Sequence, residues 1–72
     1  MDQKKLGVKL KDMYDNAPIG EKVAMIHLFG IIYSKEIKLA GVKNIIDESG
    51  ISSTYVTEVS KGMRLSKYVK PV

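Results

Sequence analysis

Apolar residues in the first part of the chain recur at the spacing of one helical face. At positions i, i+4, i+7 and i+8 they are Leu6, Leu10, Met13 and Tyr14. This spacing predicts an amphipathic helix over about residues 2–15. Asp2 is a suitable N-cap for it, because a carboxylate there accepts a hydrogen bond from an unpaired backbone N–H of the first turn. The "NAP" at 16–18 ends the helix, since the residue before a proline avoids the α region.

The next apolar segment covers most of the circumference of a helix. Its members are Val23, Ala24, Met25, Ile26, Leu28, Phe29, Ile31 and Ile32. We expect one helix from about residues 18–21 to Lys38, buried and central to the fold, because a helix that is apolar nearly all round is covered on all sides. Gly30 inside it costs about 1 kcal/mol relative to alanine. It is therefore a candidate for a close crossing with another helix.

Two shorter patterns follow, with a glycine between them. The apolar residues on one face of the first are Val42, Ile45 and Ile46, and those of the second are Tyr55, Val56 and Val59. They predict helices over about residues 42–49 and 53–61. Gly50 and Ile51 form the short turn between them.

The last residues are predicted to close the domain. Gly62 is a natural helix terminator, because glycine adopts the left-handed conformation without steric cost. The apolar residues after it are Met63, Leu65, Tyr68 and Val69, and we expect them to return to the core. Strand signals are poor throughout, so the 72 residues are predicted to form one all-α domain, a small bundle of four to five helices.

Residues 42–61, "VKNIIDESGISSTYVTEVSK", read as two short helices joined by a turn with one glycine. This stretch resembles the helix-turn-helix of bacterial and phage repressor-like DNA-binding proteins. The resemblance rests on the turn glycine, Gly50, and on the apolar Ile51 after it. It rests also on Val56 and Val59, an apolar pair three apart on the second helix.

The resemblance extends over roughly residues 42–69, because "KGMRLSKYV" looks like the glycine and basic segment that often closes such domains. Two positions depart from the pattern. Ile46 stands where alanine or glycine is usual, at the closest approach of the two helices, and Ser49 stands where an apolar residue is usual. Residues 1–41 match no motif.

The packing of this motif determines which side chains face outward. Ile51, Val56 and Val59 hold the second helix against the first, and Ser52 is placed to cap it. The side chains left outside are Ser53, Thr54, Thr57, Glu58 and Lys61. Short hydroxyls allow close approach to DNA and can bond phosphates or base edges. Glu58 repels phosphate but can accept a hydrogen bond from a cytosine amino group; alternatively it pairs with Lys61 or lies off the groove. Serine and threonine also cluster near helix N-termini for local reasons, which is the alternative interpretation.

The net charge of +4 is concentrated at one end of the chain. Residues 1–60 hold eight basic and eight acidic residues, so they sum to zero. The remaining bases are Lys61, Arg64, Lys67 and Lys70, with no acid among residues 61–72. A basic segment beside a candidate recognition helix indicates an anionic partner, and a solvated tail that only aids solubility is the alternative.

Other chemistry has little support in the sequence. The chain lacks cysteine, which excludes disulfides and thiolate metal sites, and a cytoplasmic location is expected. The longest apolar run, residues 23–32, is too short to span a bilayer. His27, the only histidine, lies in this run and is expected to be a hydrogen-bonded core residue rather than a catalyst. The acidic pairs at 12 and 15 and at 47 and 48 have no partner base or metal-ligand pattern, so we expect no enzyme activity, metal, cofactor or small-molecule ligand.

Together these patterns predict that residues 1–72 form a helix-turn-helix domain that binds double-stranded DNA sequence-specifically, as a transcriptional regulator or as the DNA-binding module of a larger protein. The predicted DNA-binding residues are Ser52, Ser53, Thr54, Thr57, Glu58, Lys61, Arg64 and Lys67. Because one short helix gives limited specificity, a homodimer or a fused partner domain is expected. The alternative function is a helical protein-interaction module that does not bind DNA.

Overall fold

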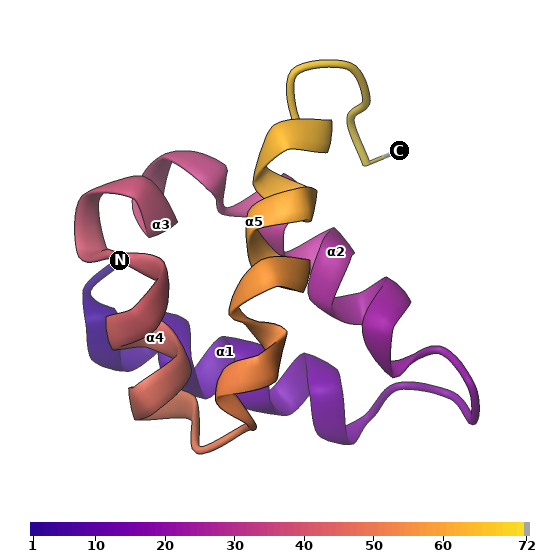
Figure 1. Cartoon of the computed structure of the whole chain (residues 1–72), viewed down its shortest axis with the longest axis horizontal. Coiled ribbons are helices and arrows are strands. Elements are labelled where there is room, and N and C mark those ends of the chain that lie inside the picture. Colours follow the sequence, from indigo (N-terminus) through magenta and orange to yellow (C-terminus); the bar gives the residue numbers. More distant parts are fainter. Residues whose placement is uncertain (72) are drawn as a thin grey trace.

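The computed structural model describes residues 1–71, and all of their regular structure is helical (Figure 1). The elements are α1 (Gln3–Asp15), α2 (Lys22–Ile32), α3 (Ser34–Ala40), α4 (Val42–Ser49), the 3-10 turn η1 (Ser53–Tyr55) and α5 (Val56–Leu65). This confirms the predicted all-α bundle of four to five helices. Among the described residues, no helix has both the length and the apolar character needed to cross a membrane.

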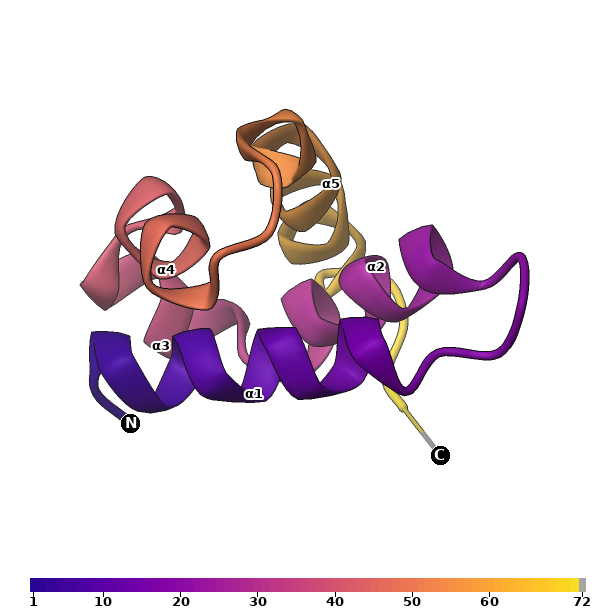
Figure 2. The ribbon, with the colours of Figure 1, turned by 90° about the horizontal axis from the view of Figure 1, so that it is seen from below.

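The first helix forms where its pattern predicts. The carboxylate of Asp2 accepts a hydrogen bond from the backbone N–H of Lys5 at 2.8 Å, which confirms the N-cap. Leu6 and Leu10 are fully buried, and α1 lies along one side of the molecule, opposite most of α5 (Figure 2). Gly7 lets α4 come close to α1, because a Cβ on Gly7 would stand 2.7 Å from the Cβ of Glu48.

The single long helix expected up to Lys38 is wrong, because the chain breaks at Tyr33. That residue has φ −107° and ψ 23°, away from regular helical values, and it separates α2 from α3. The change of direction brings Ile37 of α3 into the core, where it is fully buried. A straight continuation would have carried α3 beyond the bundle.

The expectation that α2 is buried all round is also wrong. Of its side chains only Ile26 and Phe29 are buried, whereas Val23 and Ile32 are each 42% exposed. α2 is central in a narrower sense, since it packs against both α1 and α5 (Figure 2). A domain of this size has too few helices to cover every face of its most apolar one.

α2 and α5 cross at very short distance through two glycines, which confirms the expectation for Gly30. A Cβ on Gly30 would lie 2.6 Å from the carbonyl oxygen of Val59, and a Cβ on Gly62 would overlap the carbonyl of His27. Gly62 therefore lies inside α5 instead of ending it, and the helix continues to Leu65. The predicted terminator is wrong because this glycine is needed for the crossing.

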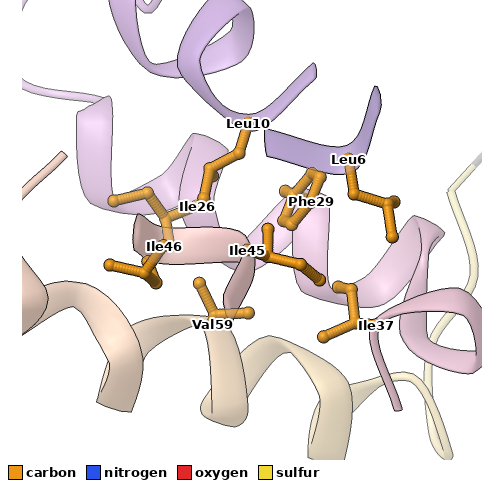
Figure 3. Packing of buried hydrophobic residues seen from close by; sticks show 8 residues of the cluster. All are labelled: Leu6, Leu10, Ile26, Phe29, Ile37, Ile45, Ile46 and Val59. Carbon is orange, nitrogen blue, oxygen red and sulfur yellow. The ribbon is translucent and has the colours of Figure 1, made fainter. Parts of the chain in front are cut away.

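The core receives at least one side chain from each α-helix (Figure 3). The buried residues are Leu6, Leu10, Ile26, Phe29, Ile37, Ile45, Ile46 and Val59. Of the apolar residues expected to return from the end of the chain, only Met63 packs against this core. Leu65, Tyr68 and Val69 are 41%, 82% and 45% exposed and line open hollows on the surface beside α2.

Candidate nucleic-acid interface

The turn between α4 and η1 is built on Gly50. It adopts φ 78° and ψ 2°, a left-handed conformation that glycine reaches without strain, and its N–H donates to the carbonyl of Ile46. This confirms the predicted turn, and α4 itself has the predicted bounds.

The two departures from the motif are both accommodated by the packing. Ile46 is 1% exposed, so the larger side chain at this position is accommodated as part of the hydrophobic core. Ser49 is only 6% exposed, but its hydroxyl donates to the carbonyl of Ile46 at 2.7 Å and accepts from the N–H of Ile51 at 3.2 Å. A serine in an apolar position is tolerated because its polar group is satisfied within the turn.

The second helix of the motif begins with a tighter turn than the sequence indicates. Ser52 caps it as predicted, since its Oγ accepts a hydrogen bond from the N–H of Thr54 at 3.2 Å. The same Oγ lies 2.9 Å from the hydroxyl of Thr54. Residues 53–55 form a 3-10 turn, and regular α-helix starts at Val56. The local explanation for hydroxyl residues thus applies to Ser52 and in part to Thr54, but not to Thr57.

The outer face of η1 and α5 is polar and open to solvent. The exposed members of the predicted set are Ser52, Ser53, Thr54, Thr57, Lys61, Arg64 and Lys67. Thr54, Thr57, Lys61 and Arg64 stand at i, i+3, i+7 and i+10, so four of these side chains share one helical face. On the opposite face, Val59 is buried against the core. The structure therefore brings four predicted residues together along one side of a helix.

Lys67 is separated from this stripe. It follows the end of α5 and lines a hollow beside Ile31 and Ile32, whereas Lys61 and Arg64 line a different, shallow hollow beside α2. The hollow lined by Lys61 and Arg64 also includes His27 and the exposed Tyr68.

Glu58 has contacts on both sides of its carboxylate. Its Oε1 lies 2.7 Å from Nε2 of His27, and its Oε2 lies 3.5 Å from Nζ of Lys61. The second contact confirms the expected alternative in which Glu58 pairs with Lys61. The hydrogen bond from His27 lowers the pKa of Glu58 below its ordinary value, and the positive charge of Lys61 adds to this, while partial burial acts in the opposite sense.

His27 is hydrogen-bonded as expected, but it is not a core residue. Its side chain is 30% exposed and bridges α2 to α5. The partner is 31 residues away along the chain, so no local pattern in the sequence points to it. Sequence reasoning missed His27 as part of this surface for that reason.

A second long-range contact fastens the start of the helix. The hydroxyls of Tyr14 and Tyr55 lie 3.3 Å apart and the ring centroids 5.4 Å apart, which joins η1 to the end of α1. The hydrogen bond with Tyr14 raises the pKa of Tyr55. The Nζ of Lys22 lies 4.3 Å from the centroid of the Tyr14 ring and donates a hydrogen bond to the backbone carbonyl of Tyr14. These contacts hold the turn and the first residues of the motif's second helix against the body of the domain.

Two short helices, a left-handed glycine turn, an anchored inner face and a polar outer face define a helix-turn-helix. Over residues 2–72 the chain matches the family described as the HTH-like domain, and it belongs to that family. This confirms the helix-turn-helix at residues 42–69 and extends the match to the three helices before it, α1, α2 and α3. The comparisons with curated proteins and with solved structures found no match.

Proposed function

We propose that this chain binds double-stranded DNA sequence-specifically, with η1 and α5 in the major groove, as a regulator of transcription or as the DNA-binding module of a larger protein. The observation that carries the proposal is the exposed polar stripe of Thr54, Thr57, Lys61 and Arg64, on the side of the helix opposite the buried Val59. Membership of the HTH-like family supports it.

The stripe divides into two parts with different chemistry. Thr54 and Thr57 occupy the beginning of the helix, where recognition helices approach base edges. Lys61 and Arg64 follow toward its C-terminal end, where long cationic side chains reach phosphates. Lys67, beyond the helix, extends the basic surface toward α2 and α3.

A titration followed by NMR tests the proposal. The amide spectrum of the 15N-labelled protein is recorded with increasing amounts of a mixed-sequence DNA duplex, at low and at moderate salt. We expect shifts concentrated in residues 52–67 that weaken as salt rises, because phosphate contacts release counterions. A spectrum that does not change at low salt would contradict DNA binding.

We further propose that the role is one of binding and not of catalysis, with no cofactor, metal or small-molecule ligand. One helix of this length contacts only a few base pairs, so sequence-specific binding calls for a second copy of the domain or for a fused partner domain. Sedimentation of the free protein and of its DNA complex measures the number of copies directly.

A protein-interaction role is the second candidate, and the uncovered apolar side chains favour it. Ile19 is fully exposed and Leu39 almost fully, and Val23 and Ile32 of α2 are partly exposed. This candidate predicts that NMR shifts appear around α2 and α3 when a partner protein is added or when the protein itself is concentrated. It also predicts that residues 52–67 do not shift when DNA is added.

A further inference from the structure

Glu58 is the only acid after Glu48 in the sequence, and it lies within the segment proposed to bind DNA. Its side chain is 24% exposed, compared with 50% for Lys61, which is the next charged residue on the same helix. A carboxylate at the edge of a phosphate-binding surface opposes binding, because like charges repel. The position of this carboxylate therefore matters for any DNA complex.

Both oxygens of the Glu58 carboxylate are engaged by the protein. His27 of α2 contacts Oε1 at 2.7 Å, a charge-assisted hydrogen bond, and Lys61 contacts Oε2 at 3.5 Å. The contact with His27 is the shorter of the two and comes from outside the helix. It draws the carboxylate toward α2, on the flank of the stripe formed by Thr54, Thr57, Lys61 and Arg64.

The glycine crossing determines that His27 can make this contact. A Cβ on Gly62 would meet the Cα, the carbonyl carbon and the carbonyl oxygen of His27, so the backbone of His27 lies directly against α5 at this point. Glu58 precedes Gly62 by four residues, one helical turn, on the same helix. The imidazole of His27 therefore reaches the Glu58 carboxylate one turn away, because the absence of a side chain on Gly62 lets α2 lie close to α5.

We propose that His27 is a positioning residue for DNA binding: it holds the Glu58 carboxylate against α2 and so keeps this negative charge away from the phosphates that Lys61 and Arg64 contact. This inference rests on the proposed function. Without His27 the carboxylate is held only by the exposed Lys61, on the surface that faces DNA. Lys61 then becomes less available for phosphate as well.

A double-mutant cycle tests the role of His27. Affinity for a labelled mixed-sequence duplex is measured at one fixed low salt concentration for the parent protein, His27→Ala, Glu58→Gln and the double variant. We expect His27→Ala to weaken binding roughly three- to tenfold, in the lower part of the range of coupling energies between contacting residues. In the Glu58→Gln background the same change should have no effect, because no charge remains to be held. Glu58→Gln alone should bind at least as tightly as the parent.

Two controls separate charge positioning from general effects. Asp12→Asn removes the same charge from the exposed outer face of α1, and in combination with His27→Ala it should leave the weakened binding unchanged. His27→Gln offers an amide donor in place of the imidazole and should recover most of the affinity. Should His27→Ala melt near the assay temperature, His27→Leu keeps the bulk without a donor and replaces it.

The outcomes are distinct. An equal loss from His27→Ala in both backgrounds would mean that His27 contacts DNA itself or supports the fold, and would overturn the positioning role. Parent-like binding by His27→Ala would overturn it as well, while leaving the proposed function intact. Failure of the parent protein to bind any duplex at low salt would overturn the proposed function and, with it, this inference.

Discussion

Gly30 of α2 and Gly62 of α5 face each other where the two helices cross, and a Cβ on Gly30 would lie 2.9 Å from the Cα of Gly62. This contact sets the position of α5 on the domain. It also places His27 within reach of Glu58. The first prediction concerns this crossing.

Gly62→Ala should destabilise the protein even though alanine is the better helix former. The added methyl would overlap the backbone of His27, so the helices must separate, and overpacking of this kind costs about 1–3 kcal/mol. Alanine's helix propensity offsets about 1 kcal/mol at most. Urea denaturation measures the difference, and Thr57→Ala on the exposed side of the same helix is the control. A variant more stable than the parent would mean that the crossing is looser than described.

The turn should respond to a different property of glycine. Within residues 1–71, no atom outside the turn lies within 4 Å of a Cβ placed on Gly50, so a side chain there meets open space, but the φ of 78° strains any β-branched residue. We expect Gly50→Val to lose about 1–3 kcal/mol of stability, and Gly50→Asn to lose less because asparagine tolerates this conformation. Thermal melts of both variants test this, and equal losses would point to a steric cause.

Salt dependence should report the phosphate contacts one by one. Arg64→Ala should flatten the slope of log K against log salt by about one unit, the contribution of one phosphate contact, and adding Lys67→Ala should flatten it by about one more. Lys4→Ala removes the same charge from the exposed surface of α1, on the side of the molecule opposite most of α5, and serves as the control. If Lys67→Ala changes the slope no more than Lys4→Ala does, Lys67 makes no phosphate contact.

Thr57 provides the sharpest test of base reading, because unlike Thr54 it has no hydrogen bond to the Ser52 hydroxyl. Thr57→Ala should change the stability by no more than about 0.5 kcal/mol, as for other exposed sites. On a DNA site selected for tight binding it should lose about 1–3 kcal/mol, and on scrambled DNA it should lose little. Equal losses on both DNAs would assign the hydroxyl to a phosphate, and no loss on either would remove α5 as the reading helix.

Glu58 should make the stability depend on pH in the acidic range. Its pKa is lowered in the folded protein by the hydrogen bond from His27, so in that range the unfolded chain binds more protons than the folded one. The stabilisation is therefore present above the ordinary pKa of a glutamate and is lost as the pH falls through the lowered value. Melts of the parent and of Glu58→Gln should converge as the pH is lowered, and a constant difference between them would contradict the pairing.

Local patterns in the sequence determined the helix-turn-helix itself. The bounds of α4, the left-handed turn at Gly50 and the cap at Ser52 all depend on residues within four positions of one another, and interactions of that range can be read from spacing and residue type. The outward positions of Thr54, Thr57 and Lys61 follow from the same periodicity, because the buried Val59 fixes which side of α5 turns inward. Arg64 joins them only because α5 continues through Gly62.

The tertiary structure decided what lies between distant segments. Gly62 is compatible both with a helix end and with a helix interior, and only the backbone of α2 against it selects the interior. The break at Tyr33 follows likewise from the place available to Ile37 in the core. The contact of His27 with Glu58 spans 31 residues, and that of Tyr14 with Tyr55 spans 41. Such pairs leave no periodic trace in the sequence, because side-chain spacing records only which face a residue occupies and not which helix comes to lie against it.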